Sequence, residues 1–418
     1  MTLLAVVVFW VLAGLVVVQA AMVAMFTWAL RGNRRPLPDD ASCPKTAVIL
    51  CLRGTDPFLP ATLEAVLDLD YPDFELRVVV DSREDPAWRV VEQVVSPRGA
   101  TNVRIEPLEQ RLETCSLKCS SVVQTVSRLD ESYEVVALLD ADTIPHRSWL
   151  RELVAPLADE NVGAATGNRW YMPQQVTMAA MIRYVWNAAA VPQMWWYKIA
   201  WGGTLAVKTE VFRRGDLLDR WSNAFCEDTM LYRMLRRHGL RVEFVPSLIM
   251  INRESCDLSG FFRWVRRQLL TARLYHPGWA AVVLHGVSTT LWPTVALVLC
   301  VVSAALGRWE AFSYALAGLL GYECCMPLLL APMEAAVRRI ARRRGEPTGW
   351  MTPGVLAWYL VSVPLTQIVY AAALASALTL RSVDWRGVHY RIDGPFRIRL
   401  VEYKPFQSET PDDAHASL

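Results

Sequence analysis

Residues 135–145 of this chain are Val-Val-Ala-Leu-Leu-Asp-Ala-Asp-Thr-Ile-Pro. The unbroken apolar run Val135–Leu139 predicts a strand that is buried on both faces, as in a parallel sheet. Asp140 and Asp142 follow directly. Ligands bind beyond the carboxyl ends of such strands, so we expect both carboxylates at the mouth of a site. Their oxygens suit Mg²⁺ or Mn²⁺, although a polar turn after a core strand is an alternative interpretation.

The composition limits the classes of protein to which this chain can belong. It has 418 residues, of which 53% are hydrophobic and 20% are charged, and its formal net charge is +2. A charge so close to zero argues against a nucleic-acid-binding protein that relies on overall electrostatic attraction. The apolar residues are concentrated in blocks, which indicates membrane segments. We therefore expect a lipid bilayer, and no nucleic acid, among the partners.

The first apolar block, Leu3–Leu30, is long enough to span a bilayer and is followed by Arg31, Arg34 and Arg35. A signal peptide carries its positive residues in front of a shorter apolar core, so residues 1–30 are interpreted as a transmembrane anchor. The positive-inside rule then places the following chain in the cytoplasm. Three further blocks predict transmembrane helices within 280–380, namely Ala280–Leu306, Ala311–Pro332 and Val355–Leu380.

Two signals conflict over which side of the membrane holds the C-terminal tail, residues 381–418. Four complete crossings would place the tail opposite the soluble part of the chain. Either Pro364 marks a segment that does not cross fully, or the tail is an exception to the positive-inside rule. We expect the polar final residues to be disordered. The arginines of the tail that favour the cytoplasm are Arg381, Arg386, Arg391, Arg397 and Arg399.

Residues 40–255 alternate strand-like and helix-like segments, beginning with a β-rich run at Thr46–Leu52. This alternation predicts a parallel sheet with helices on both faces. Neither a Gly-x-Gly-x-x-Gly nor a Gly-Lys-Ser/Thr loop follows the first strand, which disfavours a dinucleotide-binding fold and a P-loop ATPase. The residues that could instead hold a nucleotide are Arg53, Asp81, Asp85 and Lys118.

Two later segments carry further candidate residues. The acidic pair Glu227-Asp228 opens a helical run, where acids are also common as helix caps. Residues 256–279 contain an amphipathic helix, Phe261–Tyr275, that is rich in arginine and aromatic residues and directly precedes a membrane block. An interfacial helix whose arginines extend towards water would show the same pattern.

In their order along the chain, these features resemble the family 2 type of inverting, membrane-bound glycosyltransferases, and most of all their ceramide glucosyltransferase branch. The resemblance spans nearly the whole chain. It implies a GT-A type fold: an α/β domain with a nucleotide-sugar-binding parallel sheet, with N-terminal and C-terminal transmembrane helices. The segments that carry it are Arg53–Leu59, Leu69–Pro72, Asp81 with Glu84–Pro86, Asp140-Ala-Asp142, Glu227-Asp228, 263–268, and Trp385–Gly387 with Tyr390-Arg391.

The resemblance also implies a role for each candidate in the displacement of a nucleoside diphosphate by an acceptor hydroxyl. Asp228 would be the catalytic base, with Glu227 beside it. Asp142 would bind the metal ion, and Asp140 would complete the metal shell or contact the ribose. The residues that would bind the leaving diphosphate or, for the tryptophan, pack against the sugar or acceptor are Trp264, Arg266, Arg267 and Gln268.

The chain departs from the family pattern in two places. The Gln/Arg-x-x-Arg-Trp signature is not intact, and the sequence Arg-Trp-Val-Arg-Arg-Gln at 263–268 allows several registers. Which of these side chains meets the diphosphate therefore stays open. Asp81 and Asp85 are both candidates for the contact with uracil.

The resulting hypothesis is a hexosyltransferase that moves a sugar from a UDP-sugar to a hydroxyl of a membrane lipid such as ceramide. We expect the sugar to be glucose. The protein would be multi-pass, with its catalytic domain facing the cytoplasm. The apolar segment Met178–Trp196 would lie against the bilayer and admit the lipid head group. A processive polysaccharide synthase is an alternative, although three C-terminal blocks are few for its pore. A non-catalytic scaffold or transporter subunit is another, with Glu323 and His285 as its intramembrane polar residues.

Overall fold

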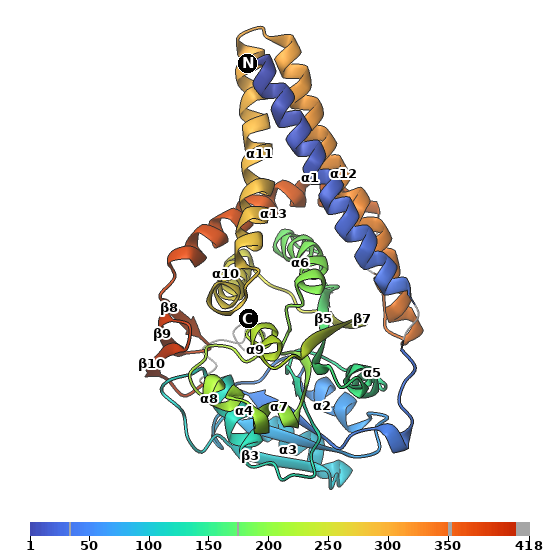
Figure 1. Ribbon diagram of the computed structural model, residues 1–418, viewed down its shortest axis with the longest axis vertical. Helices are drawn as coiled ribbons and strands as arrows, with labels where there is room; N and C mark the ends of the chain where they lie inside the picture. Colours follow the sequence, from blue (N-terminus) through green and yellow to red (C-terminus); the bar gives the residue numbers. More distant parts are fainter. Residues whose placement is uncertain (33–34, 174, 350–352, 407–418) are drawn as a thin grey trace.

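The computed structural model of this protein describes residues 1–32, 35–173, 175–349 and 353–406. Figure 1 shows an α/β part at one end of the molecule, from which three long helices project together. These helices, which we call the bundle, are α1 (Thr2–Arg31), α11 (Trp279–Ala305) and α12 (Trp309–Arg343). Arg34 and residues 407–418, on which part of the sequence analysis depends, lie outside the described residues.

The α/β part is built on a seven-stranded sheet of order β3-β2-β1-β4-β6-β5-β7. Neighbouring strands are parallel from β3 to β4 and between β5 and β7, whereas β6 runs antiparallel to both of its neighbours. The fold is thus the mostly parallel GT-A type that the sequence predicts, with one reversed strand. The strands are β1 (Thr46–Leu52), β2 (Phe74–Val80), β3 (Val103–Pro107), β4 (Val135–Leu139), β5 (Val162–Tyr171), β6 (Thr204–Lys208) and β7 (Arg241–Asn252).

Helices cover both faces of this sheet, as the side chains of β4 show. Val136 and Leu138 belong to one hydrophobic core, and Val135, Ala137 and Leu139 belong to another. All five are buried, which explains why this strand is apolar without interruption. The first core includes residues of α4 (Leu117–Val126), α7 (Thr209–Arg214), α8 (Leu217–Trp221) and α9 (Leu231–Arg237), and the second those of α2 (Leu59–Leu67), α3 (Pro86–Val95) and α5 (Trp149–Val154).

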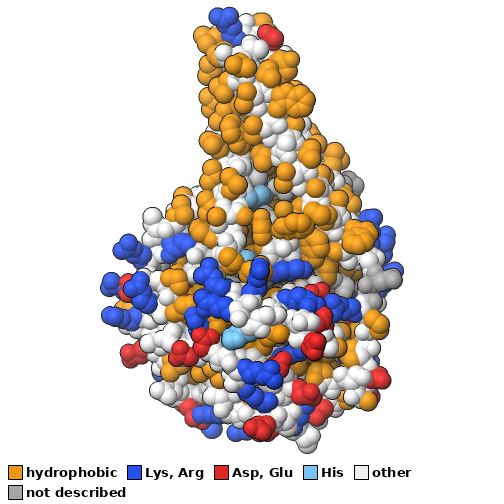
Figure 2. All heavy atoms as spheres, viewed as in Figure 1, with side chains coloured by type: hydrophobic (Ala, Val, Ile, Leu, Met, Phe, Trp, Pro, Cys, Tyr) orange, Lys and Arg blue, Asp and Glu red, His pale blue; other side chains and the backbone are white. Residues whose placement is uncertain are grey.

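Two further helices, α6 (Met178–Tyr197) and α10 (Leu258–Tyr275), join the α/β part to the bundle through a third core. Among the described residues, four helical segments are long and apolar enough to cross a membrane: α1, α11, α12 and residues Trp358–Thr379. Figure 2 shows hydrophobic side chains over the surface of the bundle, with lysine and arginine gathered where the bundle meets the α/β part. This distribution suggests a membrane protein.

Helix α13 (Pro353–Thr379) crosses the base of the bundle instead of projecting with it (Figure 1). Before it, Arg344 at the end of α12 donates a hydrogen bond to the carbonyl of Ile249 in β7 (2.9 Å). After it, Arg273 of α10 donates to the carbonyl of Leu380 (2.7 Å). The chain then forms an antiparallel sheet, which packs through Tyr390 into the same core as α4. Its strands are β8 (Ser382–Trp385), β9 (Val388–Gly394) and β10 (Arg397–Tyr403).

Both ends of α13 therefore lie at the α/β part. If α1, α11 and α12 cross a membrane, α13 cannot cross it as well, because the chain returns to the side from which it started. On that condition the bundle would make three crossings, and α13 would lie along the membrane surface. This favours the first of the two alternatives left open by the sequence. Much of the segment treated as a tail, residues 382–403, is folded into the C-terminal sheet.

This topology predicts that the α12–α13 connection and the C-terminus lie on the same side of the membrane. Epitope tags inserted at Gly345 and fused after Leu418 should be accessible to antibody from the same side of sealed vesicles. A tag at Gly307, between α11 and α12, should be accessible only from the other side. Tags at Gly345 and Leu418 that report opposite sides would show that α13 crosses the membrane.

Candidate active site

A cavity of about 420 Å³ lies beyond the carboxyl end of β4 and gathers most of the residues singled out in the sequence. Asp85 and Arg266 do not line it. The oxygens of Asp85 instead accept the backbone N–H groups of Gly54 (3.0 Å) and Ala87 (2.9 Å), which makes Asp85 the N-cap of α3. The predicted residues that line the cavity are Arg53, Asp81, Lys118, Asp140, Asp142, Glu227, Asp228, Trp264, Arg267 and Gln268.

The centre of the site is an ion triad formed by the buried Glu227 and the half-buried Lys118 and Asp140. The Nζ atom of Lys118 lies 2.7 Å from a carboxylate oxygen of each acid. Burial acts against the charge on Lys118, but the two carboxylates outweigh it and raise the pKa of the ammonium well above its ordinary value. For Glu227, burial is the larger effect and raises the pKa despite Lys118. The triad thus ties the start of α4, the end of β4 and the 227–228 loop together.

Gly202 and Gly203 allow the backbone before β6 to pass close to this triad. A Cβ atom on Gly202 would overlap the Glu227 carboxylate, and one on Gly203 would come within 2.6 Å of an oxygen of Asp140. The N–H of Gly202 donates to Asp228 Oδ2 (2.8 Å). Glycine is therefore required at both positions because of space, since neither has a positive φ.

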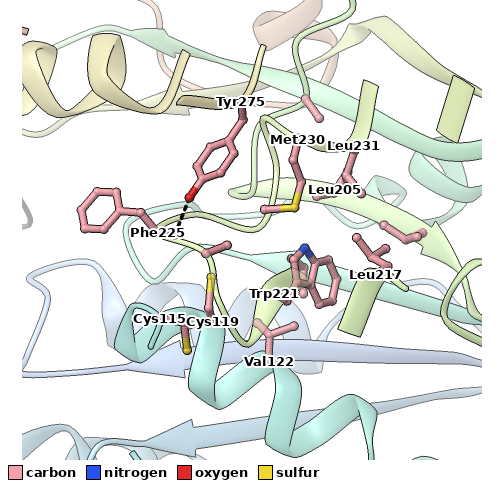
Figure 3. Packing of buried hydrophobic residues seen from close by; sticks show 14 of the residues in the cluster. Cys115, Cys119, Val122, Leu205, Leu217, Trp221, Phe225, Met230, Leu231 and Tyr275 are labelled. Atoms are coloured by element: carbon pink, nitrogen blue, oxygen red, sulfur yellow. Dashed lines mark hydrogen bonds between the residues drawn. The ribbon is translucent and has the colours of Figure 1, made fainter. Parts of the chain in front are cut away.

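The loop that carries Glu227 and Asp228 is fixed on the first core. Figure 3 shows Phe225 beside Tyr275, whose hydroxyl accepts the Phe225 N–H at 2.8 Å. The indole of Trp221 donates to the carbonyl of Glu227 (2.8 Å). Asp228 is half-buried and accepts Thr229 Oγ1 (2.8 Å) in addition to Gly202. Among the residues that the structure describes, no lysine or arginine forms an ion pair with Asp228.

Arg169, on β5, is a site residue that the sequence analysis missed. Its guanidinium lies 3.3 Å from Asp140 and 3.2 Å from Asp142, and so bridges the two aspartates. It is held there over the ring of Trp201, at 4.7 Å, and by a hydrogen bond to the hydroxyl of Tyr171 (3.1 Å). The only sequence feature that could have indicated a role for Arg169 is its position, as an arginine near the carboxyl end of an otherwise buried strand.

The charges around the aspartate pair make its two members unequal. Burial opposes ionisation of Asp140, but Lys118 and Arg169 outweigh it and lower the pKa of this carboxyl. For Asp142, burial raises the pKa, and Arg169 offsets this only in part. An oxygen of Asp142 also accepts the side-chain amide of Asn252 at the end of β7 (3.2 Å). Asp140 is therefore the more firmly ionised of the two.

A second group of charges surrounds Asp81 at the end of β2. Arg53 forms an ion pair with Asp81 Oδ2, and the hydroxyl of Tyr403 in the C-terminal sheet donates to the same oxygen (2.9 Å). The guanidinium of Arg111 lies 3.6 Å from Oδ1 and stacks on the ring of Tyr403. The buried Oδ1 atom has no hydrogen-bond donor among the described residues. Asp81 therefore keeps one acceptor position for a ligand.

Helix α10 presents only some of its arginines to the cavity. Arg263 donates to Ser259 on the exposed face, and Arg266 lies over the ring of Phe262. Arg267 lines the cavity over the ring of Trp385, at 4.6 Å. Burial, together with the charges of Arg386 and Arg169, lowers the pKa of Arg267 to about 10. No carboxylate forms an ion pair with Arg267 in the part of the chain that the structure describes.

The cavity continues from these charges into the base of the bundle. Its wall there, which we call the membrane-side chamber, contains no lysine, arginine, aspartate or glutamate among the described residues. Helix α6 also lines the cavity and contributes Trp186, which packs edge to face on Trp264 at 5.3 Å. The residues of α1, α11, α12 and α13 that line the chamber are Gln19, Val23, Val282, His285, Thr289, Tyr322, Met326, Pro327, Leu329, Leu330, Met333, Val363, Thr366, Gln367 and Tyr370.

The mostly parallel sheet, with paired carboxylates beyond β4, agrees with the nucleotide-sugar-binding fold of glycosyltransferases. The sequence profile of glycosyl transferase family 21 matches residues 8–397, and the chain belongs to this family. The family assignment agrees with the resemblance to ceramide glucosyltransferases that the sequence shows.

Solved structures of other glycosyltransferases are similar to this chain at low sequence identity. The mannosyltransferase PcManGT from Pyrobaculum calidifontis, in complex with GDP-mannose and Mn²⁺, aligns with a TM-score of 0.49 and 18% identity, over 89% of this chain and 99% of that one. Glucosyl-3-phosphoglycerate synthase from Mycobacterium tuberculosis, in complex with Mn²⁺, UDP and glucosyl-3-phosphoglycerate, aligns with a TM-score of 0.38 and 15% identity, over 57% and 85% of the two chains.

Proposed function

We propose that this protein is an inverting hexosyltransferase that transfers a sugar from a UDP-sugar to a hydroxyl of a membrane lipid such as ceramide. Glucose is the leading candidate for the sugar. The observation that carries the proposal is the continuity of one cavity between the charged site and the membrane-side chamber. A soluble donor and a lipid acceptor need such a junction to meet. Membership of family 21 supports glucosylation of a lipid.

The environment of Asp81 supports a uracil base in the donor. Its Oδ1 atom is a buried acceptor without a hydrogen-bond donor among the described residues, with Arg111 3.6 Å away as an ion-pair partner. Uracil carries an N–H group on its pairing edge that can donate to this oxygen. Guanine carries such an N–H as well, and adenine and cytosine carry amino groups on the same edge, so the choice of UDP relies on the family resemblance.

Asp228 is suited to act as the base in a direct displacement at the anomeric carbon. In this role its carboxylate accepts the proton of the acceptor hydroxyl as the acceptor oxygen bonds to the anomeric carbon. The electron pair of the broken carbon–oxygen bond leaves with the diphosphate on the opposite face. Asp228 forms no ion pair with a lysine or arginine of the described residues and is held in place by Gly202 and Thr229. Glu227, paired with Lys118, serves to position the loop.

Asp140 and Asp142 fit a divalent metal that binds together with the donor. Mg²⁺ and Mn²⁺ are commonly held by one or two carboxylates, with substrate phosphates and water as the remaining ligands. No third histidine, cysteine or acidic side chain completes a metal cage among the described residues. Asp142 is the better candidate, since Lys118 already engages Asp140. When bound, the metal supplies positive charge that offsets the departing diphosphate.

The chamber supports a lipid as the acceptor. Its wall offers no charged side chain among the described residues, which suits the apolar chains of a lipid, while the reacting head group would lie at the charged site beside Asp228. The lysine and arginine at the base of the bundle further support a cytoplasmic α/β part. Helix α6, with Trp196 exposed, would lie at the bilayer surface next to the entrance.

The function is tested by incubating the purified full-length protein with Mn²⁺, a panel of UDP- and GDP-sugars and a total lipid extract. Mass spectrometry of the lipid fraction should show the mass of one hexose added to a neutral lipid, and only with a UDP-sugar. Addition to a phosphorylated carrier lipid, formation of a polysaccharide, or no transfer at all would reject the proposal.

Two conservative substitutions separate the roles of the acids. Asp228→Asn should reduce turnover by at least about a hundredfold, the usual contribution of a general base, while UDP binding changes little. Asp142→Asn should also abolish transfer but should weaken UDP binding in the presence of Mn²⁺. Titration calorimetry with UDP and a transfer assay measure both effects. A loss of UDP affinity in Asp228→Asn would give that residue a binding role instead.

Arg169 predicts an order of binding for metal and nucleotide. Its guanidinium neutralises the aspartate pair when no donor is bound, so Mn²⁺ alone should bind weakly to the wild type and more tightly once UDP is present. Arg169→Met should bind Mn²⁺ without UDP at least about tenfold more tightly than the wild type. Electron paramagnetic resonance of free Mn²⁺ measures this directly. Equal Mn²⁺ affinities in the two proteins would show that Arg169 does not compete with the metal.

A further inference from the structure

The turn between β8 and β9 has an unusual residue at its tip. Arg386 and Gly387 form a two-residue turn in which both residues have positive φ, 49° and 74°. Asparagine, aspartate or glycine is favoured at the first position of such a turn, whereas a long side chain there strains the backbone. A strained backbone persists only where the surrounding structure holds it. The contacts of Arg386 show what holds it.

Arg386 is locked onto the loop that follows β1. Its backbone carbonyl accepts Arg53 Nε at 2.8 Å, and its own Nη1 atom donates to the carbonyl of Arg53 at 2.6 Å. Its Nη2 atom lies 3.4 Å from Asp56. These contacts join the C-terminal sheet to the wall of the donor site. They use only part of the hydrogen-bonding capacity of the guanidinium, which has five N–H groups.

Arg386 and Arg267 line the same cavity, although they come from different elements. Arg267 reaches it from α10 over the ring of Trp385, the residue before Arg386. The positive charge of Arg386 contributes to the lowered pKa of Arg267, in agreement with the contact of Arg267 with the neighbouring Trp385. Like charges held together without a carboxylate for Arg267 form a site for an anion with several oxygens.

We propose that Arg386 is a second guanidinium that binds the diphosphate of the donor, opposite Arg267, so that the C-terminal sheet completes the donor site. This inference depends on the proposed function, since it assigns a residue to the UDP moiety. It explains why an arginine occupies a turn position that disfavours it. It also gives the sheet after α13 a role in catalysis, because the leaving diphosphate carries the charge that both arginines meet.

The alternative is that Arg386 only holds the loop of Arg53 and Asp56 in place. The two roles differ in which part of the nucleotide loses affinity. A phosphate contact affects UDP and leaves uridine unchanged. A collapsed loop also disturbs Asp81, through Arg53, and therefore weakens UDP and uridine together.

The test compares Arg386→Gln and Arg386→Asn with the matched control Arg391→Gln in the full-length protein. Arg391 is an exposed arginine of the same sheet, paired with Asp393. Asparagine suits the left-handed conformation of the turn, so Arg386→Asn keeps the hairpin. UDP affinity is measured by titration calorimetry, uridine affinity by competition with UDP, and folding by the melting temperature.

Both Arg386 variants should bind UDP about tenfold or more weakly than the wild type, with uridine affinity unchanged. The control should match the wild type for both ligands. Unchanged UDP affinity in the Arg386 variants, or an equal loss for UDP and uridine, would overturn the inference. If the wild type itself binds no uridine nucleotide, the proposed function fails first, which separates the two failures.

Discussion

Lys118 lies between Asp140 and Glu227, and this ion triad holds together the three segments that form the centre of the site. Its three members come from the start of α4, the end of β4 and the loop before α9. Glu227 is buried, so removal of Lys118 would leave its carboxylate without a counter-ion, which is destabilising. The triad therefore fixes the distance between the aspartates that would meet the donor and Asp228, which would meet the acceptor. Gly202 and Gly203 leave the space that this arrangement requires.

Around the triad, the site is arranged so that a nucleoside diphosphate completes its charge balance. Arg169 neutralises the aspartate pair, whereas Arg267 has no carboxylate of its own among the described residues. A cluster of this kind is preorganised for an anion, since the cations are already desolvated and need no rearrangement when the ligand arrives. The membrane-side chamber shows the opposite arrangement, with an uncharged wall on the described residues. The boundary between the two regions lies at Trp264 and α6.

Much of this site could be predicted because its signals are local in the sequence. The apolar run Val135–Leu139 defines a buried strand, and Asp140 and Asp142 follow it directly. The face of α10 is also implicit in its spacing. Trp264 lies three and four residues before Arg267 and Gln268, and Thr271 lies four and three residues after them, which places all four on one side of a helix, and all of them line the cavity. Arg266 falls outside this spacing. Arg263 does not, since it lies four residues before Arg267, but its side chain donates to Ser259 instead.

The features that sequence patterns did not reveal depend on contacts between distant segments. Arg169 occupies a buried strand, and only the fold brings it to the aspartates. The C-terminal sheet follows an apolar helix whose composition is that of a membrane span, so its return to the α/β part cannot be read from hydropathy. Asp85 shows the converse case, because a carboxylate after a strand serves equally well as a helix cap.

The most direct test of this arrangement of donor, metal and arginines is an experimental structure of the full-length protein with UDP and Mn²⁺. We predict that the diphosphate lies between Arg267 and Arg386, that the metal contacts Asp142, and that the N–H of uracil points to Asp81. Arg169 should then have moved away from Asp142. UDP bound outside this cavity, or a diphosphate that contacts neither arginine while Arg169 still bridges Asp140 and Asp142, would contradict the account.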